Sequence, residues 1–164
     1  MDIIPFDQLA SEVSLWASAN FGKRQHPWLG MMEELGELAH CSLKRIQGIR
    51  GFDDHDFYIK NYIDAVGDIG VYASNYAVVH SIHMEWPENR DYELHTSDLC
   101  YAMASYWLST MMITTDAADK RLYHFLAYVD ALARKEGTTL AAATTKTWEQ
   151  VKERNWVKNK EAGI

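Results

Sequence analysis

The sequence predicts an all-α fold, a helical bundle of about five to six helices. Along most of its 164 residues, apolar side chains recur at spacings of three and four, which is the period of an amphipathic helix. No alternation with a period of two persists, and no Asn-Gly or Asp-Gly pair marks a β-hairpin. The prolines Pro5, Pro27 and Pro87 fall between candidate helices, where a residue without a backbone N–H is tolerated.

Three candidate helices occupy the first half of the chain. The first covers residues 6–20 and is followed by a break at 22–27. The second begins near Trp28 and ends at Gly48, because glycine commonly stands just past the end of a helix. The apolar stripe of this second helix comprises Met31, Leu35, Leu38, Ser42 and Ile46. A connector, GIRGFDDHD, leads to a third and longer helix over residues 57–83.

The second half begins with a polar stretch and continues with three more helices. Residues 84–95, MEWPENRDYELH, form the most polar segment, and we interpret them as a loop. Helical patterns then cover residues 96–114, 118–135 and 138–156. Gly137 separates the last two patterns, and Thr138 or Thr139 is a candidate N-cap of the sixth helix.

Composition indicates one globular domain, residues 1–164. With 48% hydrophobic and 24% charged residues the chain is close to the globular average, and two cysteines are too few for a disulfide scaffold. The net charge of −7 argues against a general binder of nucleic acid polymers or membrane surfaces, which needs a basic face. No apolar run approaches the roughly 20 residues of a membrane span. We therefore expect a cytoplasmic protein.

Acidic side chains gather on the second and third helices. Glu34 and Glu37 are three residues apart, and Glu33 and Glu37 are four apart, so their side chains can share one surface. On the third helix a polar line runs along an otherwise apolar surface; it comprises Asn61, Asp64, Asp68 and Asn75. Carboxylates are rarely buried without partners, because removing their water is costly. One interpretation of this line is a simple solvent-facing side of the helix.

The other interpretation is a cation site between the two helices. Small residues adjoin the carboxylates and would let the helices approach closely; they are Gly36, Ala65, Gly67 and Gly70. Converging carboxylates suit Mg²⁺, which takes oxygen ligands and is commonly shared with substrate phosphates. A di-iron centre is a weaker alternative. It needs two Glu-x-x-His motifs, and the chain offers one, Glu37 and His40.

The order of these residues resembles a known family. EELGEL at 33–38 followed by DAVGDIGVYASN at 64–75 is similar to the MazG-like nucleotide pyrophosphohydrolases of the all-α NTP pyrophosphatase superfamily. That family has E-x-x-E on one helix, E-x-x-D on the next, and commonly an Asn seven residues later. The matching residues are Glu34, Glu37, Asp68 and Asn75. One position departs from the pattern: Ala65 stands where an acid is expected, and Asp64 could replace it.

The resemblance extends to the flanks of the motif. WASANFGKRQ, LKRIQGIRG and VKERNWVKNKEAG are all similar to MazG-like segments, so roughly residues 6–80 and 145–163 are covered. It implies a bundle with a four-helix core of the MazG type. It also implies hydrolysis of a nucleoside triphosphate, ribose or deoxyribose, to the monophosphate and pyrophosphate.

The expected cofactor is Mg²⁺, with Mn²⁺ as a possible substitute. Its expected ligands are Glu34, Glu37, Asp64 and Asp68. The bound ions would neutralise the phosphates and activate a water, and Glu33 or Glu34 would orient or deprotonate that water.

Further residues are candidates for substrate binding. The resemblance implies that Asn75 orients a ligand or contacts the nucleotide. Lys44, on the same helix face as Glu37, and the cations Arg154 and Lys158 are candidates for phosphate contacts. Trp16 is the first candidate for stacking on the base, before Phe21, Trp28 and Trp107, although aromatic residues at helical spacing more often belong to the core.

Two points remain open at the level of sequence. The resemblance implies a homodimer or higher homo-oligomer. The candidate interface consists of the apolar faces of the fourth and fifth helices: Leu99, Met103, Trp107, Met111, Leu122, Phe125, Val129 and Leu132. The alternative function is a non-catalytic helical nucleotide-binding or assembly protein on the same scaffold, which the substitution at Ala65 would favour.

Overall fold

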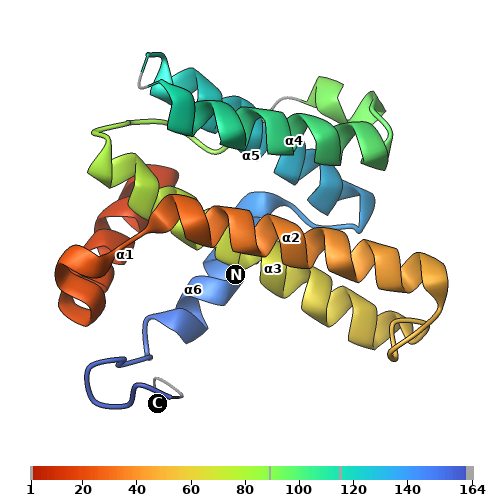
Figure 1. Cartoon of the computed structure of the whole chain (residues 1–164), viewed down its shortest axis with the longest axis horizontal. Helices are drawn as coiled ribbons and strands as arrows, with labels where there is room; N and C mark the ends of the chain where they lie inside the picture. Colours follow the sequence, from red (N-terminus) through yellow and green to blue (C-terminus); the bar gives the residue numbers. More distant parts are fainter. Residues whose placement is uncertain (1, 89, 115, 162–164) are drawn as a thin grey trace.

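The computed structural model describes residues 2–88, 90–114 and 116–161, and within this part of the chain it is all-helical, without a β-strand (Figure 1). The all-α class is therefore confirmed. The α-helices are α1 (Phe6–Phe21), α2 (Pro27–Gln47), α3 (His55–Val79), α4 (Ser97–Ile113), α5 (Ala118–Lys135) and α6 (Leu140–Val151). Two short 3₁₀ helices, η1 (Gly22–Arg24) and η2 (Arg90–Leu94), lie in the connections.

Most helix boundaries agree with the sequence prediction because local signals set them. Gly48 ends α2 in the left-handed conformation, with φ of 61°. The Thr96 and Thr139 side chains cap α4 and α6, accepting hydrogen bonds from the backbone N–H of Leu99 and Ala142. Of the loop predicted at 84–95, residues 84–88 are irregular, residues 90–94 form η2, and residue 89 lies outside the described residues.

The helix predicted over 57–83 is shorter at its C-terminal end, because α3 stops at Val79. Ser81 adopts a φ of 54°, and the Ile82 N–H reaches back to the Ala77 carbonyl over 2.8 Å. The Ser81 N–H bonds to the Val78 carbonyl, which completes a Schellman motif with Ile82 buried behind it. A serine in place of the usual glycine hides this helix end from sequence inspection.

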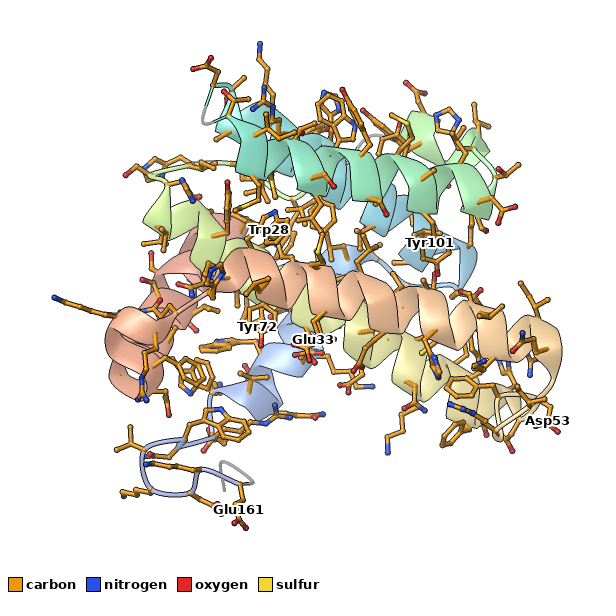
Figure 2. All side chains as sticks on the ribbon, in the orientation of Figure 1. Trp28, Glu33, Asp53, Tyr72, Tyr101 and Glu161 are labelled. Carbon is orange, nitrogen blue, oxygen red and sulfur yellow. The ribbon has the colours of Figure 1, made fainter. Side chains whose placement is uncertain are left out.

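The α3 helix is the centre of the molecule. It forms an antiparallel hairpin with α2, and α1 and α6 pack against its other faces (Figure 1). The α4–α5 pair forms a second layer above this group, with α4 beside α2. Trp28 ties the layers together, since its Nε1–H donates to the Leu108 carbonyl over 2.9 Å between α2 and α4 (Figure 2). The described helices include none long and apolar enough to cross a membrane.

Glycines on α3 receive α6 rather than α2. A Cβ built on Gly67 or Gly70 would lie 2.0 Å and 1.9 Å from the Oγ1 atoms of Thr147 and Thr144, respectively. The expectation that these glycines bring α2 onto α3 is therefore wrong. Gly36 has open space at its Cβ position. The close approach between α2 and α3 occurs at Gly30, where a Cβ would lie 2.4 Å from the Tyr72 ring.

The apolar stripe of α2 differs at its end from the predicted one. Met31, Leu35 and Leu38 are buried as expected, and Cys41 continues the stripe. Ser42 is half-buried and shares a 2.7 Å hydrogen bond with the Tyr101 hydroxyl. Ile46 is 83% exposed and does not belong to the core.

The predicted subunit interface lies mostly inside the chain's own core. α4 packs on α5, which buries Met111 and the four residues of α5, Leu122, Phe125, Val129 and Leu132. Met103 and Trp107 are half-buried against the same core, and Leu99 is 42% exposed. The exposed apolar side chains of α2 form a different surface: Leu29, Met32, Leu43 and Ile46.

Candidate functional site

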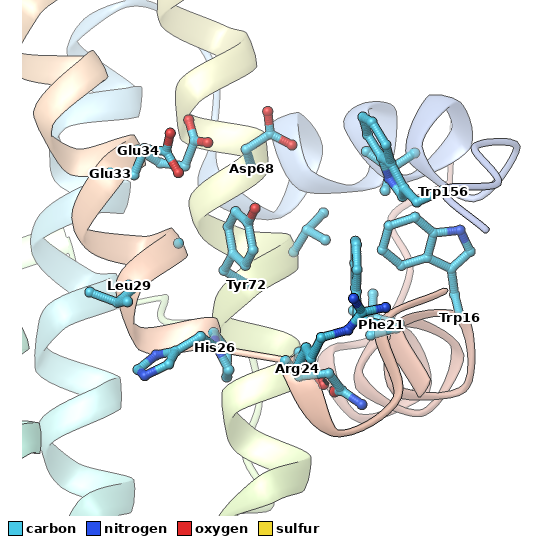
Figure 3. A pocket seen from close by; sticks show the side chains of 18 of the residues that line it. Trp16, Phe21, Arg24, His26, Leu29, Glu33, Glu34, Asp68, Tyr72 and Trp156 are labelled. Atoms are coloured by element: carbon cyan, nitrogen blue, oxygen red, sulfur yellow. Dashed lines mark hydrogen bonds between the residues drawn. The ribbon is translucent and has the colours of Figure 1, made fainter. Parts of the chain in front are cut away.

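A cavity of about 450 Å³ lies between α1, the start of α2, the middle of α3 and the segment that follows α6. Its two ends differ in chemistry (Figure 3). Glu33 and Glu34 of α2 face Asp68 of α3 at one end, and a group of aromatic side chains lines the other. Those aromatic residues are Trp16, Phe21 and Trp156. The cavity therefore combines an anionic end with an apolar, aromatic end.

The carboxylate end carries charge repulsion that the cavity walls do not fully relieve. Burial raises the pKa of Glu34 to about 8, and repulsion from Asp68 and from Glu37, Glu33 and Asp64 adds to it. Burial also raises the pKa of Asp68 to about 6, with a further contribution from Asp64, while Arg154 acts in the opposite direction. A divalent cation would relieve this repulsion and hold both groups in the ionised form.

The other two predicted metal ligands lie at the rim of the carboxylate group. Glu37 and Asp64 are exposed and do not line the cavity, although their charges act on Glu34. Ala65 is buried in the hydrophobic core, so the acid of the family pattern is replaced here by a packed methyl group. Asp64 is the neighbouring acid that acts on Asp68.

The donor set fits a hard cation, although its members are not gathered as a finished site. In the described part of the chain, no three His, Cys, Asp or Glu side chains stand together in a metal-holding arrangement. Carboxylate oxygens from α2 and α3 are nevertheless the ligand type that Mg²⁺ requires. For the di-iron alternative, the expected His40 ligand instead packs edge-on against Phe52 at 5.9 Å.

Long-range hydrogen bonds build the aromatic end. The indole Nε1–H of Trp16 donates to the backbone carbonyl of Arg154 over 3.0 Å. The backbone N–H of Trp156 donates to the Asn20 Oδ1 over 2.7 Å. Trp16 also packs edge-on against Phe21, at 5.5 Å between ring centroids. These contacts turn the chain back toward α1 after Val151, so the helix predicted to continue to residue 156 ends earlier.

The three predicted phosphate-binding cations have different surroundings. Arg154 lines the cavity and lowers the pKa of Asp68, so it lies within electrostatic reach of the carboxylate end. Lys158 is exposed and does not line the cavity. Lys44 points its Nζ at the Gln47 Oε1, 2.9 Å away, and also lies outside the cavity lining. The cavity thus supports a role for Arg154 and not for Lys158 or Lys44.

The predicted aromatic candidates divide in the same way. Trp16 and Phe21 line the cavity, as the sequence suggested. Trp28 bridges α2 and α4, and Trp107 stacks on His124 with 4.6 Å between ring centroids. These last two side chains belong to the packing of the core rather than to the cavity.

Several lining residues escaped sequence analysis. Tyr72 stands between the two ends of the cavity, four residues after Asp68 and therefore on the same helix face (Figure 3). Burial raises the pKa of its hydroxyl, and the charges of Glu34 and Asp68 raise it further. Arg24, Gln25 and His26 come from the connection between α1 and α2, where no periodic pattern indicates which side chains face inward.

Asn75 is a buried polar residue of the cavity wall. It is 5% exposed, and its Nδ2–H donates to the Gln25 Oε1 over 3.0 Å. Its position in the cavity agrees with the predicted contact to a ligand.

Comparisons of the chain with protein-family models, curated proteins and solved structures found no match. The arguments for a function therefore come from the residues of the cavity and from the sequence resemblance described above.

Proposed function

We propose that the chain is a Mg²⁺-dependent nucleoside triphosphate pyrophosphohydrolase, which releases the monophosphate and pyrophosphate. The observation that carries the proposal is the two-ended cavity. One continuous space joins the carboxylates of two helices, of which Glu34 and Asp68 are half-buried, to three aromatic side chains. A nucleotide has the same division, with a phosphate chain that needs cations and a flat base that stacks on aromatic side chains. The resemblance to the MazG-like family supports the same reaction.

Each carboxylate has a role in this proposal. Glu34 and Asp68 would hold the cation from inside the cavity, and Glu37 and Asp64 would supply further ligands from the rim. When bound, Mg²⁺ neutralises phosphate charge and favours ionisation of a water molecule. Glu33 lines the cavity and is exposed, so it is the carboxylate available to accept a proton from the attacking water. That water adds to phosphorus as the bond between the α- and β-phosphates breaks.

The aromatic end holds the base, and Arg154 assists the phosphates. The aromatic side chains offer surfaces on which any of the bases can stack; they are Trp16, Phe21 and Trp156. Arg154 lines the same cavity and lies within electrostatic reach of Asp68, whose pKa it lowers. An arginine there can pair with a phosphate oxygen and offset the negative charge of the chain.

The test of the reaction class is pyrophosphate release from a panel of ribo- and deoxyribonucleoside triphosphates. We expect turnover with Mg²⁺ or Mn²⁺, loss of turnover with a chelator, and loss in Asp68→Asn. Asp53→Asn is the matched control, because Asp53 is an exposed acid in the α2–α3 connection at the far end of the hairpin (Figure 2). A folded wild-type protein that binds nucleotides without releasing pyrophosphate would favour the alternative, a non-catalytic nucleotide-binding protein.

Arg154→Ala is expected to raise KM for the triphosphate about tenfold, because a charge-assisted hydrogen bond to phosphate contributes about 1.5 kcal/mol or more. Lys158→Ala is the matched comparison, since it removes a cation four residues away that lies outside the cavity lining. Its KM should stay within about twofold of wild type, as for a surface charge of small effect. Steady-state kinetics with the preferred substrate measure both, and equal effects of the two substitutions would remove Arg154 from the proposal.

The proposal includes a homo-oligomer, with a surface different from the one first expected. The exposed apolar side chains of α2 follow a spacing of three and four with the exposed small residues between them: Leu29, Met32, Gly36, Ala39, Leu43 and Ile46. Such a heptad-like stripe suits helix-to-helix association. Light scattering of wild type beside Leu43→Glu, which places a charge on the stripe, tests this surface.

A further inference from the structure

A pair of side-chain amides, Gln25 and Asn75, lies in the cavity wall with one hydrogen-bonding atom left over. Asn75 is almost completely buried, and its Nδ2–H donates to the Gln25 Oε1 over 3.0 Å. Its other amide atom, Oδ1, is buried and has no hydrogen-bond partner among the described residues. Buried polar atoms are nearly always paired, so this acceptor in the cavity wall lacks a donor that a ligand could supply.

The orientation of the Gln25 amide follows from its neighbours. The Gln25 Nε2–H donates to the Gly22 carbonyl over 2.9 Å and to the Ser18 Oγ over 3.2 Å. A backbone carbonyl can only accept a hydrogen bond, so the nitrogen of the amide must face it. Gly22, whose carbonyl accepts this hydrogen bond, has a φ of 56°, a backbone conformation that glycine adopts without strain. Gln25 therefore presents its oxygen toward Asn75.

This orientation fixes Asn75 in turn. Because the Gln25 Oε1 can only accept, Asn75 must direct its NH₂ group toward it. The Oδ1 then faces away from Gln25 as an acceptor, and a flip of the amide would place two oxygens against each other. The pair is consequently polarised: a ligand group that meets Asn75 Oδ1 has to donate an N–H or an O–H.

The position of Asn75 indicates which part of a nucleotide it meets. Asp68, Tyr72 and Asn75 follow one another along one face of α3, and seven residues correspond to about 10.5 Å along the helix axis. All three line the cavity. If the phosphates lie at Asp68, this distance exceeds the reach of the sugar hydroxyls and corresponds to that of the base.

We propose that Asn75 selects nucleotides through an N–H donor of the base, and that Gln25 is a positioning residue that makes Asn75 an obligate acceptor. The proposal rests on the proposed function only in taking a nucleotide as the ligand. It predicts that a base methylated at the donating nitrogen is rejected, because the methyl group removes the donor and leaves the buried oxygen unpaired. We expect about 10- to 100-fold weaker binding, which is the effect of leaving one buried acceptor without its donor.

The experiment measures binding rather than turnover. Calorimetry on the full chain compares uridine, cytidine, adenosine and guanosine with their methylated forms. These are 3-methyluridine, N4,N4-dimethylcytidine, N6,N6-dimethyladenosine and, because guanine has donors at both N1 and N2, 1-methylguanosine together with N2,N2-dimethylguanosine. The base that binds best should lose about tenfold or more on methylation. A 3′-deoxynucleoside of the same base tests the sugar hydroxyl and should bind as its parent does.

Gln25→Met separates positioning from simple structural support. Methionine keeps the length of the side chain but lets the Asn75 amide turn and present either atom. We expect the parent nucleoside to bind within about threefold of wild type, while the discrimination against the methylated base falls below about threefold. Gln150→Met, at an exposed glutamine of α6, is the matched control and should keep the full discrimination.

Three results would overturn the proposal: equal binding of parent and methylated nucleosides, a loss confined to the 3′-deoxynucleoside, or no binding of any nucleoside at millimolar concentration. The result is independent of hydrolysis. Discrimination without pyrophosphate release would preserve the amide pair and reject the proposed function. Pyrophosphate release at equal rates from parent and methylated triphosphates would support the proposed function and reject the role of the amide pair.

Discussion

Glu34→Gln is expected to lower kcat about 100- to 10,000-fold. The glutamine keeps the shape of the side chain but removes a charge that, under the proposed function, would face a cation in the cavity. The loss of one partner from a buried charge interaction costs about 3–5 kcal/mol, which corresponds to this range of rates. Glu149→Gln is the control, because Glu149 is an exposed residue whose contact is a surface salt bridge to Lys152. Its activity should match wild type.

The same substitution should stabilise the metal-free protein at high pH. The pKa of Glu34 is about 8 in the folded chain, against an ordinary value of 4.5, so the folded state keeps a proton that the unfolded state releases. The contribution of Glu34 to the free energy of unfolding is therefore fully present below pH 4.5 and is lost as the pH rises through about 8. Asp68, with a folded pKa of about 6, acts in the same direction over a lower range. The side chain of glutamine does not titrate, so in Glu34→Gln this position contributes no pH dependence to stability.

Thermal unfolding at two pH values measures this effect. After allowance for solvent screening of a partly exposed group, Glu34→Gln should add roughly 1–2 kcal/mol at pH 9, or about 2–8 °C in Tm, and nothing at pH 4. Mg²⁺ should raise the Tm of wild type more than that of the variant, since cation binding displaces the proton. A variant that is active, or that is less stable than wild type at pH 9, would contradict the assignment of Glu34.

Gly70→Val is expected to destabilise the fold by about 3 kcal/mol or more and to lower Tm by about 6–12 °C. A Cβ at this position would lie 1.9 Å from the Oγ1 and 2.8 Å from the Cβ of Thr144. Thr144 is completely buried, its hydroxyl donates to the Leu140 carbonyl, and its branched side chain has few rotamers. α6 therefore has to move away from α3 to admit the new side chain.

Gly36→Val is the matched control on the neighbouring helix. Gly36 is exposed, and a Cβ there meets nothing within 4 Å. Because valine is a slightly better helix former than glycine, this variant should unfold at or a little above the wild-type temperature. Gly70→Ala combined with Thr144→Ala should recover part of the loss seen with Gly70→Ala alone. Equal stability of Gly70→Val and Gly36→Val in thermal unfolding would show that α3 and α6 do not pack as described.

Local chemistry accounts for the parts of the fold that the sequence predicts well. A glycine after α2, and threonines before α4 and α6, mark helix ends through hydrogen bonds to residues no more than four positions away. The end of α6 is different, because the Trp156 N–H bonds to Asn20, 136 residues earlier in the chain. No pattern within a short window contains that information.

The residues of the candidate site likewise include some that a local sequence pattern indicates and some that it does not. The polar line on α3 indicated Asp68 and Asn75, since polar residues on an apolar helix are conspicuous in a sequence. Gln25 lies in a connection, where only the three-dimensional path of the backbone decides which side chains face a cavity. Gly67 and Gly70 were recognised as sites of close approach, but a helix has several faces, and a missing side chain does not identify the neighbour that uses the space.

Because the chain returns to α1 after α6, the cavity can form only late during synthesis of the described residues. Helices α1 to α5 leave the ribosome first, and domains generally begin to fold from the N-terminal side. Until residue 156 has emerged, the cavity lacks the part of its wall formed by Val151, Arg154 and Trp156. Until α6 has emerged, Gly67 and Gly70 of α3 have no helix packed upon them. Closure of the cavity therefore waits for the segment that follows α6. Any ligand that binds only the closed form would stabilise that form by mass action.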